Sequence, residues 1–191
     1  KKWVINIRGK LKDEAEKYIH NSLSEKCEVF NYDLGDWQKE TKILINKIDT
    51  DYILYWVEDH ILQVNSNILD DAVNEMKSSE SDFLSYTFHC FGYHKEVYDN
   101  LFFNKLNLQK HINTFKLDIS SYYKIYRSRK ITPNINQYVT ALPSIFSKEL
   151  FINLINRRYY KFKLIETPHF MEKPPYSIRY LPFNFSYTNK E

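Results

Sequence analysis

Two carboxylates and an imidazole follow the most apolar run of the chain. Glu58, Asp59 and His60 come directly after residues 52–57, which are apolar or aromatic without alternating with charged residues. Such a run predicts a strand buried on both faces of a mostly parallel sheet. Open α/β sheets bind ligands at the carboxyl ends of their strands, so these three side chains favour a divalent cation and, through it, a diphosphate. A solvated turn is the alternative that three residues alone leave open.

Strands and helices alternate along the first half of the chain. Short runs rich in β-branched and aromatic residues are separated by segments whose apolar residues recur every three or four positions. The expected strands cover residues 3–7, 28–32, 51–57 and 82–88, and the expected helices cover residues 13–23, 39–48 and a segment around 69–76. This alternation predicts an α/β fold with a mostly parallel central sheet and flanking helices.

The second half of the chain is less regular. Residues 115–126 suggest a strand or hairpin, residues 147–156 a helix and residues 160–165 a last strand. From Pro168 onward, further prolines exclude a helix and impose an extended conformation, so we expect a C-terminal arm. The length of 191 residues fits a single domain covering residues 1–191.

Composition and missing motifs exclude several classes of function. The formal net charge of +3 does not favour nucleic acid as a partner. Cys27 and Cys90 have no metal-ligand spacing, which favours free thiols in a reducing, cytoplasmic compartment. The longest apolar run is too short for a transmembrane segment. Arg127–Lys130 and Arg157 with Arg158 could meet lipid-linked phosphates or an anionic membrane surface, or form solvated faces. Nucleotide-binding glycine loops and the common hydrolase and zinc-protease motifs are absent.

The segments around the acidic motif resemble a known enzyme family. Residues 50–60 (TDYILYWVEDH), residues 68–73 (ILDDAV) and residues 81–83 (SDF) look like the strand, acidic motif, helix and following strand of nucleotide-sugar glycosyltransferases of the GT-A fold. Residues 142–151 (LPSIFSKELF) are similar to an acceptor-side segment of bacterial polysaccharide and glycolipid transferases. The resemblance implies a GT-A-like, Rossmann-related fold in which residues 1–88 bind the donor and residues 89–191 form the acceptor side.

The resemblance also implies roles for particular residues. Glu58 would face the base or ribose of the donor, and Asp59 would coordinate Mn²⁺ or Mg²⁺ on its phosphates. His60 stands where the family often has a second acid, and a neutral imidazole adds no charge to a metal site. Arg8 and Gly9 follow the first strand, where the family binds the nucleotide. A surface arginine beside a turn glycine is the alternative at that position.

The base that removes the acceptor's proton is a carboxylate late in the chain in this family. The candidates here are Glu149, Glu166 and Glu172, and His169 could be a distant ligand of the metal or the phosphates. Glu149 has a simpler explanation as an acid in the first turn of a helix, and a lone histidine among aromatics is often structural.

These inferences predict a glycosyltransferase that moves a sugar from a nucleoside-diphosphate sugar to a glycan or glycolipid acceptor. Two alternatives stay open. One is a degenerate, non-catalytic transferase-like module that binds its ligand within a larger protein, which His60 favours. The other is a sugar-phosphate nucleotidyltransferase, although a Gly-rich basic loop after the first strand is missing.

Overall fold

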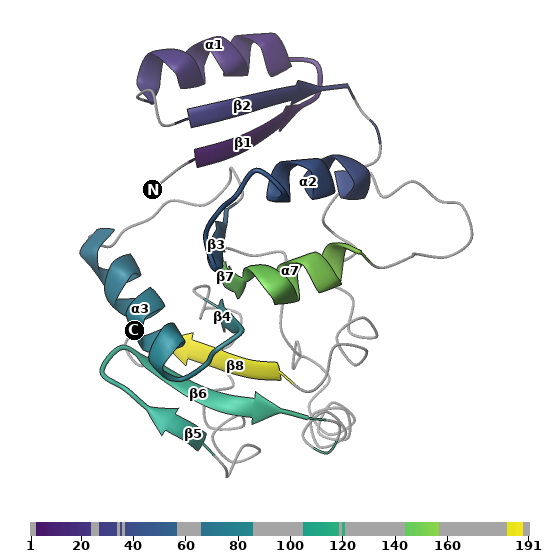
Figure 1. The fold of residues 1–191 in the computed structure, drawn as a ribbon. Helices are drawn as coiled ribbons and strands as arrows, with labels where there is room; N and C mark the ends of the chain where they lie inside the picture. The colour runs from purple at the N-terminus through teal and green to yellow at the C-terminus, as the bar shows by residue number, and fades with distance from the viewer. Residues whose placement is uncertain are drawn as a thin grey trace, which may run out of the picture. The chain divides into compact units, whose positions relative to one another are not determined.

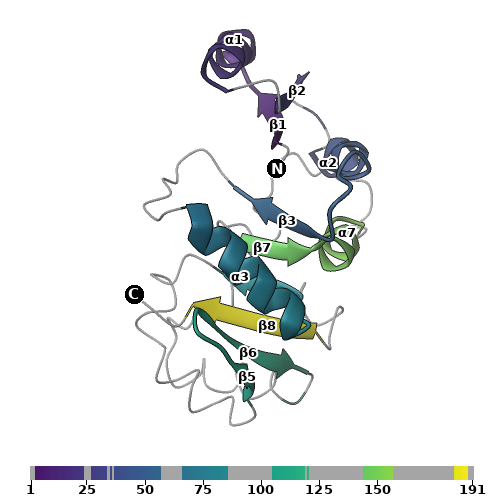
Figure 2. The same cartoon turned by 60° about the vertical axis from the view of Figure 1, so that its left-hand side comes forward.

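The chain forms two compact units in the computed structural model. One comprises Lys1–Thr50 with Ile155–Phe170, and the other comprises Asp51–Leu154 with Met171–Glu191. The structure describes residues 3–23, 27–33, 35, 37–56, 66–85, 105–118, 120, 144–156 and 183–188. Figure 1 and Figure 2 show the helices and strands of both units.

The first unit is built on a βαβ arrangement. Its described elements are β1 (Trp3–Arg8), α1 (Lys12–Ser22), β2 (Cys27–Tyr32) and α2 (Trp37–Ile45). β1 pairs in parallel with β2, and Asn6 lies opposite Phe30. Asn31 bonds to Asp13 and Glu16 of α1, whereas Arg8 meets Glu40 of α2. Because side chains alternate between the faces of a strand, α1 and α2 lie on opposite faces of the pair.

The second unit is built on a six-stranded mixed sheet. Its strands follow the order β3, β7, β4, β8, β6, β5, and only the β4–β8 pair is parallel. The elements of this unit are β3 (Tyr52–Tyr55), α3 (Ser66–Ser78), β4 (Phe83–Ser85), β5 (Lys105–Leu108), β6 (Ile112–Leu117), β7 (Ser144–Ser147), α7 (Lys148–Ile155) and β8 (Phe183–Thr188).

The α/β class predicted from the sequence is confirmed, but the prediction of a mostly parallel sheet is wrong. β7 lies between β3 and β4 and runs antiparallel to both. β3 is the end strand of this sheet among the described residues, and only Ile53 of its four residues is buried. Its continuous apolar run therefore reflects packing beside one antiparallel neighbour and not burial between two parallel ones.

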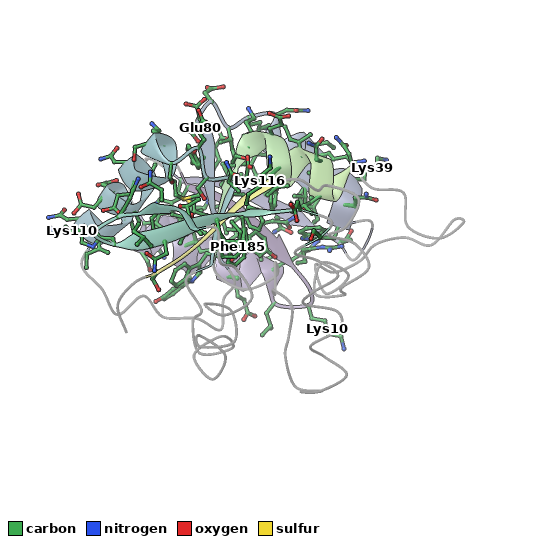
Figure 3. The ribbon with its side chains drawn as sticks, turned by 90° about the horizontal axis from the view of Figure 1, so that it is seen from below. Lys10, Lys39, Glu80, Lys110, Lys116 and Phe185 are labelled. Atoms are coloured by element: carbon green, nitrogen blue, oxygen red, sulfur yellow. The ribbon has the colours of Figure 1, made fainter. Side chains whose placement is uncertain are left out.

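The extended C-terminal arm is also corrected in part. Residues 183–188 are extended, as the prolines predicted, but they form β8 between β4 and β6. Phe185 is buried there and lies among the side chains of the sheet, whereas Lys110 and Glu80 extend outward (Figure 3). The end of the chain thus supplies a central strand.

Four helices lie where the apolar spacing predicted them. Residues 13–23, 39–48, 69–76 and 147–156 correspond to α1, α2, α3 and α7. The expected strand at 82–88 is present as β4, and β6 covers the beginning of the strand expected at 115–126. The strand expected at 160–165 lies outside the described residues.

Aromatic rings cover one face of the mixed sheet. Phe146 of β7, Phe83 of β4, Phe185 of β8 and Phe115 of β6 are consecutive neighbours, with ring centroids 4.8 to 5.1 Å apart. Phe151 of α7 packs against Phe146 with its centroid 5.1 Å away. Tilted rings at such distances add attraction to their hydrophobic burial. This row therefore fixes α7 on the aromatic face.

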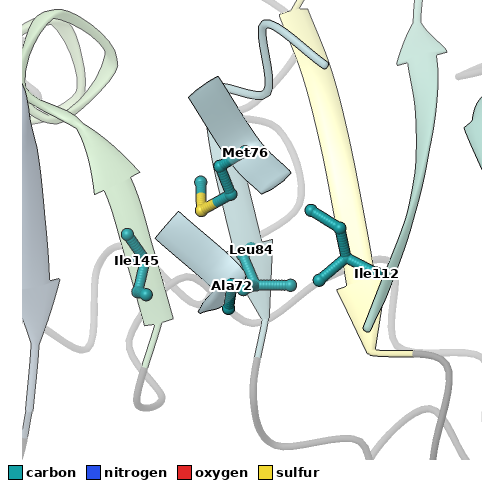
Figure 4. Packing of buried hydrophobic residues seen from close by; sticks show 5 residues of the cluster. All are labelled: Ala72, Met76, Leu84, Ile112 and Ile145. Atoms are coloured by element: carbon teal, nitrogen blue, oxygen red, sulfur yellow. The ribbon is translucent and has the colours of Figure 1, made fainter. Parts of the chain in front are cut away.

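Helix α3 covers the opposite face. Ala72 and Met76 form a buried cluster with Leu84, Ile112 and Ile145, which come from three different strands (Figure 4). The four-residue spacing of Ala72 and Met76 puts both on one side of the helix. The sheet is thus enclosed between α3 and α7.

Four buried hydroxyl groups lie between α3 and this face of the sheet. Thr114 donates to Ser79 over 3.0 Å and lies 2.6 Å from the hydroxyl of Ser186, which donates to Ser81. Ser79 in turn donates to the carbonyl of Glu75. Each hydroxyl thereby has a partner, as burial requires.

We expect Thr114→Val to destabilise the protein by about 1–3 kcal/mol, because the change keeps the shape and removes a partner of two buried hydroxyls. Urea denaturation of the variant and the parent protein measures the difference. Thr188→Val, the same change at the end of β8, serves as the control and should stay within about 0.5 kcal/mol. Equal midpoints for Thr114→Val and the parent protein would show that the hydroxyl chain does not stabilise the fold.

Candidate functional site

The carboxyl ends of β1 and β2 meet at one edge of the first unit, because the two strands are parallel. Arg8 ends β1 and Gly9 follows it with a φ of 106°, a conformation that a residue with a Cβ adopts only with strain. An added Cβ at Gly9 would meet nothing within 4 Å. The glycine is therefore required by the turn and leaves open space at this edge.

The Arg8 side chain is held by its own unit. A terminal guanidinium nitrogen donates to the carbonyl of Gly35 over 2.8 Å, and Nε lies 3.6 Å from Oε2 of Glu40. Both charged side chains are mostly buried, with 13% of Arg8 and 17% of Glu40 exposed. Burial and the Glu40 carboxylate raise the pKa of the adjacent Tyr32. Arg8 thus has a fixed orientation at the edge.

A second ion pair lies at the same edge and is more exposed. Lys12, in the first turn of α1, donates to Asp33 after β2, and 92% of the Asp33 side chain is exposed. The hydrogen bond between them raises the pKa of Lys12 and lowers the pKa of Asp33. An exposed pair of this kind is weakly held and screened by salt. An anionic ligand could therefore replace Asp33 as the partner of the Lys12 ammonium group.

Glu149 lies in the second unit and lines a hollow of about 500 Å³. Asp51 and Tyr52 contribute from the start of β3, Ser147 from the end of β7, and four residues from α7: Lys148, Glu149, Ile152 and Asn153. Ser147 accepts a hydrogen bond from the Leu150 amide and so begins α7 as its cap. The hollow therefore lies where β3, β7 and α7 meet.

The hollow lies beside the amino end of β3, and the chain continues toward residues 58–60 from the other end of this strand. Tyr52 pairs with Ser147 beside the hollow, whereas Tyr55 pairs with Ser144 at the end from which the chain continues to Glu58. Three residue steps along a strand span about 10 Å. Glu149 therefore does not share an edge with the carboxyl end of β3.

The other predicted site residues lie outside the described residues. These are Glu58, Asp59, His60, Glu166, His169 and Glu172, and their roles stay predictions. Within the described ranges, no group of three or more histidine, cysteine or acidic side chains could hold a metal ion. Across those same ranges, no helix combines the length and apolar character needed to cross a bilayer.

The sequence did not single out several polar residues at the carboxyl edge of β1 and β2 and at the hollow beside α7. Glu40 pairs with Arg8, and Lys12 pairs with Asp33 at the same edge. The predicted βαβ order carries a signal for Lys12 and Asp33, because both follow from placing two parallel strand ends side by side. Asp51 and Asn153 had no such signal. Their proximity depends on β7, which was expected as the segment before a helix and not as a strand.

In comparisons with known proteins, no family model matches the chain and no curated protein matches it.

Arg8 and Glu40 should be energetically coupled. We expect a double-mutant cycle of Arg8→Met and Glu40→Gln to give a coupling energy of about 1–2 kcal/mol, because the pair is largely removed from water. Urea denaturation of the four proteins measures this. The exposed pair, tested with Lys12→Met and Asp33→Asn, is the matched control and should show no measurable coupling. Equal coupling in the two cycles would contradict the structural role given to Arg8.

Proposed function

We propose that the chain is a glycosyltransferase that moves a sugar from a nucleoside-diphosphate sugar to a glycan or glycolipid acceptor in the cytoplasm. The observation that carries the proposal is the order of β3, the acidic residues 58–60, α3 and β4 along an α/β unit. The GT-A resemblance of the sequence implies this order. The two cysteines, which favour a reducing compartment, support the cytoplasmic location.

Donor binding is assigned to Asp59 together with Glu58. Carboxylate oxygens and an imidazole nitrogen are a donor set that suits Mn²⁺, so Asp59 and His60 would hold the cation. When bound, such a cation stabilises the negative charge of a leaving nucleoside diphosphate. The resemblance assigns Arg8 and Gly9 to the donor as well; in the structure the Arg8 guanidinium donates to the Gly35 carbonyl within the first unit.

Removal of the proton from the acceptor hydroxyl is assigned to Glu149, Glu166 or Glu172. Of these, Glu149 lies in the first turn of α7, beside Ser147 and the amino end of β3. A general base must come within hydrogen-bond reach of the hydroxyl that it deprotonates.

The test is calorimetric titration of the full chain with UDP-, GDP- and dTDP-sugars, each with and without Mn²⁺. We expect one of these donors to bind saturably, and Asp59→Ala to weaken its binding about ten- to hundredfold, the usual effect of losing a charged hydrogen-bonding group. Asp49→Ala removes an exposed carboxylate elsewhere and should leave binding unchanged. Donor binding that is identical in Asp59→Ala and the parent protein would refute the proposal.

Product analysis separates the rival functions. Release of nucleoside diphosphate from the bound donor supports a transferase, and its absence despite donor binding supports a non-catalytic module. Pyrophosphate release from a nucleoside triphosphate and a sugar phosphate would instead identify a nucleotidyltransferase.

A further inference from the structure

Helix α1 differs from the other helices that the structure describes in how little of it is buried. None of its residues is buried, whereas α2, α3 and α7 each bury at least two apolar side chains. Tyr18 of α1 is 71% exposed, and Leu11, the N-cap of the helix, is 66% exposed. Helices in proteins owe most of their stability to the packing of an apolar face. α1 thus presents to solvent the kind of surface that the other described helices bury.

Large and small side chains alternate along one flank of α1. Spacings of four, three and four residues place them on the same side of the helix, and together they form the α1 strip: Leu11, Ala15, Tyr18 and Ser22. Asp13 and Glu16 lie on the other flank, where each accepts a hydrogen bond from Asn31 of β2. The α1 strip is therefore on the flank nearer to β1.

Trp3 extends this apolar surface onto the strand pair. It precedes Ile7 by four residues on β1, and Ile7 pairs with Asn31, so Trp3 is on the face that α1 covers. A helix that joins two parallel strands runs antiparallel to them, which places Ser22 toward the start of β1. Trp3 is 49% exposed there. The surface therefore contains two exposed aromatic side chains, the residue class that is enriched in protein interfaces.

The α1 strip fits a second copy of itself in the antiparallel direction. Leu11 and Ser22 are equally far from the middle of the strip, and so are Ala15 and Tyr18. In an antiparallel pair, each large side chain of one helix consequently lies opposite a small side chain of the other. Large residues can then pack as knobs into the spaces beside small ones. A twofold axis produces every such contact twice.

The charges beside the α1 strip also fit a second copy. Glu14 and Lys17 are three residues apart and follow the strip on its outer side. In the antiparallel pair, Glu14 of one copy lies beside Lys17 of the other, and the twofold axis repeats this pair of opposite charges. Charges at the rim of a helix pair select the partner and its orientation.

The charges of α1 disfavour a membrane as the partner of the strip. The helix carries three acidic residues and two lysines. Helices that lie on anionic membranes are instead rich in lysine and arginine on their polar face. A second copy of the chain matches both the apolar strip and the mixed charges beside it.

We propose that the α1 strip and Trp3 form a twofold interface through which two copies of this chain associate. One flank of an 11-residue helix and a single tryptophan give a small interface, near the lower limit of about 1,200 Å² for specific ones. The dimer is therefore weak, and its population depends on protein concentration. The interface is independent of the transferase proposal, because none of its residues is assigned to the donor or the acceptor.

The first experiment is analytical ultracentrifugation of the full chain over about 1 to 300 µM. We expect the average mass to rise from that of one chain toward that of two. Tyr18→Asn should raise the concentration needed for half dimerisation at least about tenfold, because both copies lose a central aromatic contact. Ile43→Asn removes an exposed apolar side chain of α2 and is the matched control, which should leave dimerisation unchanged. Circular dichroism checks that each variant is folded.

Charge reversal tests the antiparallel arrangement without changing the apolar strip. Glu14→Lys and Lys17→Glu should each weaken the dimer about three- to tenfold, because like charges then meet across the twofold axis. A mixture of the two variants should associate at least as tightly as the parent protein, since each mixed pair restores opposite charges. Lys116→Glu, the same kind of reversal on β6, is the control and should have no effect.

Three results would overturn the proposal. The first is the mass of a single chain at every concentration. The second is a dimer that Tyr18→Asn and both charge reversals leave unchanged, which would place the interface elsewhere. The third is a monomer that cosediments with vesicles of phosphatidylcholine and about 30% phosphatidylserine and loses this binding in Tyr18→Asn, which would make the strip a membrane contact.

Discussion

The double pairing of β7 is the constraint on which the second unit depends. All four of its residues pair with β3 on one side, and three of them, residues 144–146, pair with β4 on the other. Ile145 enters the cluster beneath α3, Phe146 enters the row of aromatic rings, and Ser147 caps α7. Both faces of the sheet and the start of a helix therefore rely on one short strand. A polar substitution at Ile145 or Phe146 would leave one of these layers without its central contact.

Asp82 extends this constraint to the end of the chain. Its backbone exchanges hydrogen bonds with Ser147 and Asn184, and its carboxylate bonds to the same two residues. These contacts close loops of about 65 and 102 residues, the separations within each pair. Such long-range closures are slow to form and cooperative once formed. The mixed sheet therefore requires the last strand, β8, and a chain shortened before residue 183 would lack the central partner of β4 and β6.

The helices could be predicted from the sequence and the order of the strands could not. Helical periodicity is a local signal, which is why the spacing of Leu69, Ala72, Val73 and Met76 was sufficient for α3. Strand pairing depends on distant segments. The run of residues 144–147 is too short for its pattern to distinguish a strand from the beginning of a helix. At the end of the chain, the prolines before residue 183 favoured an extended arm, although Phe183, Phe185 and Tyr187 alternate as in a strand. The two strands that the sequence did not predict, β7 and β8, are the ones that give the sheet its mixture of antiparallel and parallel pairs.

The same distinction explains what could be predicted of the two candidate places. Arg8 and Gly9 follow a strand of a βαβ unit, so their position at a strand edge follows from local order. The surroundings of Glu149 depend on β7, because only its pairing with β3 brings Asp51 beside α7. The antiparallel direction of β7 then separates Glu149 from the end of β3 that leads to Asp59. Glu149 and Tyr55 thus belong to opposite ends of one short strand pair, a separation that only the pairing of β7 with β3 determines.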